Sequence, residues 1–100
     1  MEAYILINMQ ANVSWQIAEA SLKIEGVRTI HVVTGQFDAV AVVQFSDLDD
    51  LRKIIDRIQH EKGVLRTQSL IIIPPPARID DTIPSLSEEE KTGLEKYPDR

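Results

Sequence analysis

The chain contains no cysteine among its 100 residues, so it has no disulfide cross-links, thiol nucleophiles or thiolate metal sites. Basic side chains are few and scattered, the formal net charge is −5, and the densest basic group is Arg52-Lys53 with Arg57. Nucleic-acid binding normally needs a clustered basic face. We therefore do not expect this chain to bind DNA by itself.

Long apolar runs and a basic leader are also missing. The N-terminus, MEAYILINMQ, carries no basic segment, and its apolar stretch is too short for a signal peptide or a membrane span. We expect a cytoplasmic protein that does not enter a membrane. One hundred residues make one small domain with a modest core.

Apolar periodicity predicts four strands and two helices. We expect strands at residues 3–9, 27–33, 37–45 and 64–73, and helices at residues 13–25 and from Ser46 or Asp47 to the segment 61–63. The two halves have the same order of features, which is a strand, a helix, a Gly-Val pair and a closing strand. The pairs Gly26-Val27 and Gly63-Val64 lie 63 − 26 = 37 residues apart. The order β-α-β-β-α-β with right-handed crossovers predicts a ferredoxin-like α+β fold, a four-stranded antiparallel sheet with both helices on one face.

The composition changes at Pro74, where three consecutive prolines stop the last strand. We assign residues 1–73 to the folded domain and residues 74–100 to a proline-rich, acidic tail. Ser87 begins a capping-box pattern that predicts a short helix to about Lys96. The tail is either mobile or packed on a neighbour through its apolar side chains, which are Ile79, Ile83, Leu86 and Leu94.

The sheet face away from the helices is also expected to be apolar, which is unusual for a face in contact with water. We expect a second subunit to cover it, sheet against sheet. The alternative is a monomer whose tail folds across the sheet. A further apolar stripe of Trp15, Ala18 and Leu22 on the first helix is either peripheral core or another subunit contact.

Residues with catalytic or metal-binding patterns are hard to find. No serine has a nucleophile-elbow context, and there is no phosphate-binding loop. His31 and His60 lack linked carboxylates, and Asp47, Asp49 and Asp50 are better explained as helix-start charges than as calcium ligands. We therefore expect no catalytic residue, no metal site and no cofactor. The segment Thr34-Gly35-Gln36-Phe37-Asp38 remains, either a hairpin turn or a binding loop.

Two segments carry a resemblance to a known family. Residues 34–38 match the pattern Thr-Gly-x-Tyr/Phe-Asp, and residues 63–69 match Gly-Val-x-x-Thr-x-Thr/Ser before the last strand. With the β-α-β-β-α-β order and Gly26-Val27 before the second strand, residues 3–73 resemble the ligand-binding domain of Lrp/AsnC transcriptional regulators, also called the RAM domain.

The resemblance implies homodimers that pair through their sheets and assemble into octameric or decameric rings. It also implies small effectors, usually amino acids, bound between dimers. The ligand-binding residues that match by position are Thr34, Gly35, Gln36 and Asp38 in the loop, with Thr67 and Ser69 contributed by a neighbouring subunit. Backbone amides near Gly35 could hold an α-carboxylate, Asp38 could pair with an α-ammonium group, and the two hydroxyls could complete the site.

The chain departs from full-length regulators because a strand begins at about Ala3, which leaves no room for a helix-turn-helix domain. It therefore resembles the stand-alone members, and co-assembly with full-length regulators is a hypothesis. Two alternatives stay open. One is a small dimeric α+β barrel enzyme, monooxygenase-like, with Tyr4, Asn8 or His31 in an enclosed cavity on the sheet. The other is a structural oligomer without a ligand.

Overall fold

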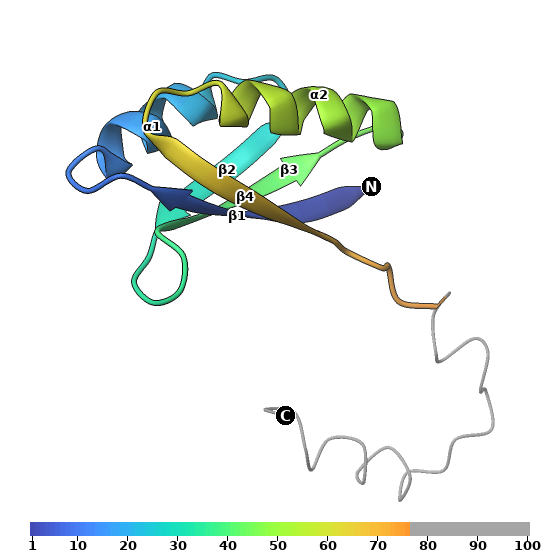
Figure 1. The fold of residues 1–100 in the computed structure, drawn as a ribbon. Helices are drawn as coiled ribbons and strands as arrows, with labels where there is room; N and C mark the ends of the chain where they lie inside the picture. Colours follow the sequence, from blue (N-terminus) through green and yellow to red (C-terminus); the bar gives the residue numbers. More distant parts are fainter. Residues whose placement is uncertain (77–100) are drawn as a thin grey trace, which may run out of the picture.

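The computed structural model describes residues 1–76, and it has the predicted order of elements. The elements are β1 (Glu2–Met9), α1 (Ser14–Leu22), β2 (Val27–Val32), β3 (Ala39–Gln44), α2 (Leu48–Gln59) and β4 (Val64–Ile71). The strands form one antiparallel sheet in the order β2-β3-β1-β4, and both helices cover the same face (Figure 1). The ferredoxin-like prediction is confirmed. The predicted tail helix and the tail's apolar contacts lie outside the described residues.

The core lies between the helices and the two central strands. Alternation along β1 turns Ile5 and Ile7 toward the helices, where they pair with Ala41 and Ala39 of β3 and are fully buried. From α2 the core receives Leu51, Ile54 and Ile58, spaced three and four residues apart on one side of the helix. Full burial of one such aliphatic side chain contributes about 1.5–3 kcal/mol, so this layer is the main source of stability.

Helix α2 begins at the predicted cap. The Asp47 side chain accepts a hydrogen bond of 2.8 Å from the backbone N–H of Asp50. In the first turn, Asp49 pairs with Arg52 at 2.9 Å and with Lys53 at 3.5 Å. The hydrogen bond from Arg52, then that from Lys53, lowers the pKa of Asp49 below its ordinary value. All three side chains are exposed, so these pairs stabilise the helix only slightly.

Helix α1 is shorter than predicted. It ends at Leu22 rather than at residue 25, because the N–H groups of Lys23 and Ile24 bond three residues back and tighten the chain into a turn. The stripe of Trp15, Ala18 and Leu22 is divided, since Ala18 is buried whereas Trp15 is 72% and Leu22 49% exposed. With nine and twelve residues, α1 and α2 are both too short to cross a membrane.

Two glycines let each half of the chain pack on the helix of the other half. Gly26, at φ +99°, precedes β2, and a Cβ there would lie 2.6 Å from Cδ1 of Ile54 in α2. Gly63, at φ +105°, precedes β4, and a Cβ there would lie 2.9 Å from Cγ2 of Val13 at the start of α1. Each position therefore requires glycine both for its backbone angle and for the close approach of a helix. The repeated Gly-Val pairs of the sequence mark these two contacts.

Replacing Gly26 by alanine should destabilise the fold by about 2–5 kcal/mol, the sum of strain at positive φ and overpacking against Ile54. Gly35→Ala is the matched control, because Gly35 also has positive φ but nothing lies within 4 Å of its Cβ direction. Urea unfolding should give the control only the smaller strain penalty. Equal losses in the two variants would show that the contact with Ile54 does not matter.

Candidate functional site

The loop with the Thr-Gly-x-Phe-Asp pattern joins β2 to β3 and projects from the sheet on the side away from the helices (Figure 1). It is closed at its base, where the N–H of Val33 donates to the carbonyl of Asp38 at 2.9 Å. Thr34, Gly35 and Gln36 are exposed at its tip. Gly35 has φ +119° with no atom within 4 Å of its Cβ direction, so its backbone is open to a bound molecule.

Asp38 holds the base of this loop to β1. Its Oδ2 accepts a hydrogen bond of 2.7 Å from the N–H of Met9, and its own N–H donates to the carbonyl of Ile7 at 2.8 Å. A half-buried carboxylate that accepts from a backbone amide stabilises by about 1.5–3 kcal/mol. This contact explains why an acidic residue stands at the start of an otherwise apolar strand. A carboxylate has several acceptor positions, so Asp38 retains capacity for a ligand.

Asn8 and Arg66 lie beside the loop, although neither was predicted to bind the effector and Asn8 was named only for the enzyme alternative. The Asn8 Nδ2 donates to the carbonyl of Gln36 at 2.7 Å, and its Oδ1 accepts from Nε of Arg66 at 3.2 Å. The two residues are cross-strand partners on β1 and β4, on the sheet face away from the helices. Arg66 falls inside the Gly63–Ser69 segment, but only the strand register shows which face it occupies.

Thr67 and Ser69 lie on the other face of the sheet. They pair with Ile7 and Ile5, whose side chains point to the helices, and Oγ1 of Thr67 accepts a hydrogen bond of 2.9 Å from Nε2 of Gln59 in α2. The strands β2 and β4 are also at opposite edges of the sheet. One subunit therefore does not bring these hydroxyls to its own loop, and a site that contains both sets needs two subunits.

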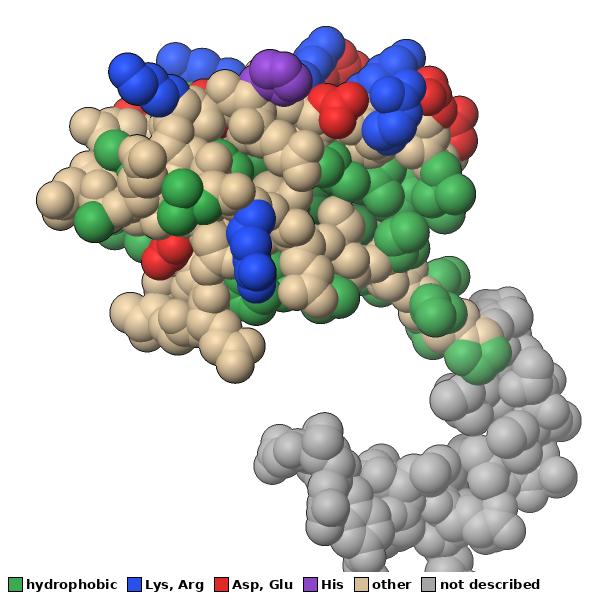
Figure 2. Space-filling view, in the orientation of Figure 1, with side chains coloured by type: hydrophobic (Ala, Val, Ile, Leu, Met, Phe, Trp, Pro, Cys, Tyr) green, Lys and Arg blue, Asp and Glu red, His purple; other side chains and the backbone are tan. Residues whose placement is uncertain are grey.

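The sheet face away from the helices, which we call the open face, has an apolar centre and polar ends. Its centre consists of Tyr4, Leu6, Val40, Val42 and Leu70, placed on this face by the strand register. Tyr4 and Leu70 are cross-strand partners and are 42% and 45% exposed. The same register also puts Thr29, His31 and Gln68 on this face, so the expected apolar character is limited to the cluster along β1, β3 and Leu70. Figure 2 shows charged side chains over the helices and hydrophobic side chains below α2 and toward the end of β4.

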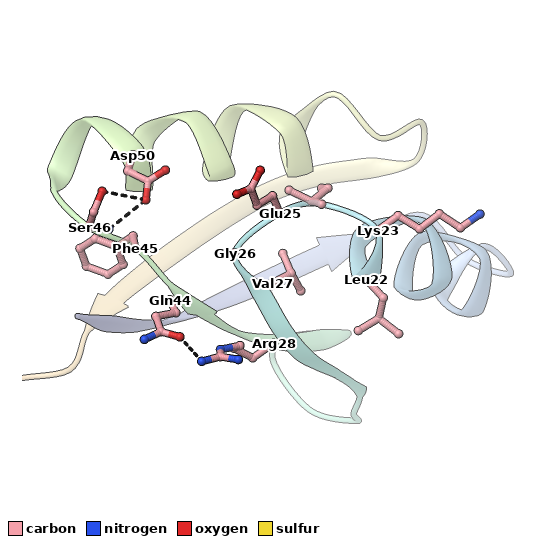
Figure 3. Close-up of a pocket in the computed structure, with 11 residues that line it drawn as sticks. Leu22, Lys23, Glu25, Gly26, Val27, Arg28, Gln44, Phe45, Ser46 and Asp50 are labelled. Carbon is pink, nitrogen blue, oxygen red and sulfur yellow. Dashed lines mark hydrogen bonds between the residues drawn. The ribbon is translucent and has the colours of Figure 1, made fainter.

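An open groove of about 700 Å³ lies at the opposite end of the β2–β3 hairpin from the loop (Figure 3). It is lined by the turn before β2, the end of β3 and the start of α2. Asp50 accepts there from the N–H and the hydroxyl of Ser46 at 2.9 and 3.2 Å, and Arg28 donates to Gln44. None of the predicted binding residues lines this groove, nor do Tyr4, Asn8 or His31, which the enzyme alternative would place in a cavity.

The family is decided by comparison with known proteins. The family model described as the Lrp/AsnC ligand binding domain matches residues 2–79. The chain belongs to this family. Among its relatives is the HTH-type transcriptional regulator LysM of Sulfurisphaera tokodaii, 34% identical over 58 residues, which are 58% of this chain and 41% of that protein. The chain spans less than half of the curated relatives that it matches.

Solved structures share the Lrp/AsnC domain fold. A protein of Thermus thermophilus has a TM-score of 0.71 at 29% identity, and the match covers 77% of this chain and 98% of the Thermus protein. A feast or famine regulatory protein from M. tuberculosis, solved in complex with L-methionine, has a TM-score of 0.61 at 24% identity. That match covers 78% of this chain and 53% of the mycobacterial protein, and at this identity it shows the fold alone.

The contact between Asp38 and Met9 predicts different effects for two substitutions. Asp38→Ala removes the acceptor and should lower the free energy of unfolding by about 1.5–3 kcal/mol. Asp38→Asn keeps a carbonyl oxygen that can accept from the Met9 amide, so it should lose clearly less. Urea unfolding of both variants measures this difference. Equal losses would mean that the charge of Asp38, and not its hydrogen bond, stabilises the loop base.

Proposed function

We propose that this Lrp/AsnC domain binds an amino-acid effector at the loop of residues 34–38 and acts as a regulatory module rather than as an enzyme. The observation that carries the proposal is the loop itself, because an exposed backbone at Gly35 is held at its base by Asp38. Family membership supports it, as do the relatives, which are transcriptional regulators. The L-methionine complex of the mycobacterial protein makes methionine a natural first ligand to test.

The chemistry of the loop suits a zwitterion. Backbone N–H groups near Gly35 can donate to an α-carboxylate, as amides in tight turns do for other anions. An acceptor position of Asp38 that Met9 does not use can receive an α-ammonium group. Thr67 and Ser69 of a neighbouring subunit would add hydroxyls, provided that they become accessible in the assembly. We propose that the effector site consists of six residues, which are Thr34, Gly35, Gln36, Asp38, Thr67 and Ser69.

We further propose that two subunits pair through their open faces and that such dimers assemble into a ring. An apolar sheet centre in water would be an unusually large exposed patch for a monomer. A site shared between subunits links effector binding to assembly, because a molecule that binds only the assembled form stabilises it by mass action. The absence of cysteine and the relatedness to transcriptional regulators support a cytoplasmic location.

A thermal-shift screen against the twenty amino acids tests effector binding. At one hundred times its Kd, a ligand adds about 2.7 kcal/mol to the unfolding free energy, which raises Tm by about 10–20 °C in a domain of this size. We expect such a rise for one or a few amino acids. It should disappear in Asp38→Asn, which keeps the contact with Met9 but removes the charge. If no amino acid changes Tm, the loop is a hairpin turn and amino-acid sensing is wrong.

Light scattering after size-exclusion chromatography tests the dimer. Leu70→Glu puts a charge in the apolar centre of the open face and should convert dimers to monomers. Leu48→Glu is the control, since Leu48 is equally apolar but is exposed at the start of α2, on the helix side of the sheet. An unchanged mass for Leu70→Glu, or a monomeric wild-type protein, would contradict sheet-to-sheet pairing.

A further inference from the structure

One side chain of β1 links the middle of the loop to β4. Gln36 lies at the loop tip, and its carbonyl accepts from Nδ2 of Asn8. The other end of the same amide, Oδ1, accepts from Nε of Arg66. The orientation of the amide is fixed by its partners, because a carbonyl can only accept and the Nε of an arginine can only donate. The side chain of Asn8 therefore forms hydrogen bonds with the loop and with β4 at the same time.

The loop is otherwise held only near its ends in the described part of the chain. Asp38 fixes its C-terminal base to Met9 and Ile7, and Val33 closes it against Asp38. Between these points, Gln36 is attached to the sheet through Asn8. The contact lies directly beside Gly35, whose backbone faces open space. A change at Asn8 thus acts on the tip of the loop without touching its base.

We propose that Asn8 is a positioning residue that holds the tip of the loop in its effector-binding conformation and joins it to Arg66 on β4. The inference rests on the proposed function and adds a residue that the family motif segments do not contain. A loop ordered before binding loses less conformational entropy when the effector arrives. If only a fraction of molecules has the ordered tip, the apparent Kd rises by the reciprocal of that fraction.

Three substitutions distinguish the contributions of the two hydrogen bonds that the Asn8 amide forms. Asn8→Ala removes both hydrogen bonds. Asn8→Asp keeps an oxygen for Nε of Arg66 but has no donor for the carbonyl of Gln36. Arg66→Ala leaves the bond to Gln36 in place. Gln16→Ala is the control, because Gln16 is exposed on α1, on the helix side of the sheet and away from both the loop and the open face.

The experiment combines NMR order parameters of the backbone amides of residues 34–37 with calorimetric titration of L-methionine. We expect both Asn8 variants to have lower order parameters at these amides than the wild type, with α2 unchanged. Loss of one exposed hydrogen bond, typically near 1 kcal/mol, corresponds to about fivefold weaker binding of L-methionine. Arg66→Ala should have a smaller effect, and Gln16→Ala none. Tm should change little in any of them, since none of the substituted residues lies in the core.

Unchanged order parameters in both Asn8 variants would overturn the proposal. It would also fail if the order parameters fell while the affinity for L-methionine stayed at the wild-type value, because the tip would then be held without any consequence for binding. A wild-type protein that does not bind L-methionine would remove that ligand from the proposed function. In that case the order parameters still decide whether Asn8 holds the loop.

Discussion

The structure depends on one reciprocal contact, in which each half of the chain uses a glycine to admit the helix of the other half. Gly26 lies against Ile54 of α2, and Gly63 lies against Val13 at the start of α1. The carbonyls of the two glycines also accept from the ends of β3 and β1, at 2.7 and 2.8 Å. Because a side chain at either point would meet a helix, the observed close packing of the helices on the sheet requires glycine at both positions. The layer of buried aliphatic side chains lies between the surfaces that these contacts bring together.

Because both helices cover one face of the sheet, the ends of the β2–β3 hairpin and the opposite face of the sheet remain accessible. The β2–β3 hairpin has the Gly26 contact at one end and the loop of residues 34–38 at the other. At the loop end, Asp38 and Asn8 each connect the hairpin to β1, one at the base and one at the tip. The loop therefore combines an open backbone with a fixed position, which suits recognition of a small polar molecule. The open face beside it is the surface through which we propose that two subunits pair.

Much of this architecture could be predicted from the sequence, because local signals agree with each other. Apolar alternation predicted the strands, the Gly-Val pairs marked the turn from helix to strand in each half, and Asp47 was one of the two predicted caps of α2. The end of α1 was not predictable from periodicity, since Ile24 continues the apolar pattern although the chain has already turned. The role of Asp38 depends on pairing with a strand 29 residues away. The separation of Thr67 from the loop depends on register, which a sequence alone does not reveal.

The central claim is that the loop, and not the groove beside Gly26, receives an effector. The chain has only four glycines, so backbone amide NMR can follow Gly35 and Gly26 separately. A titration with the amino acids, L-methionine first, measures both signals in one sample. The account predicts that the amide of Gly35 shifts with saturation while that of Gly26 does not move. A shift of Gly26 with Gly35 unchanged would place the binding site in the groove and contradict the account.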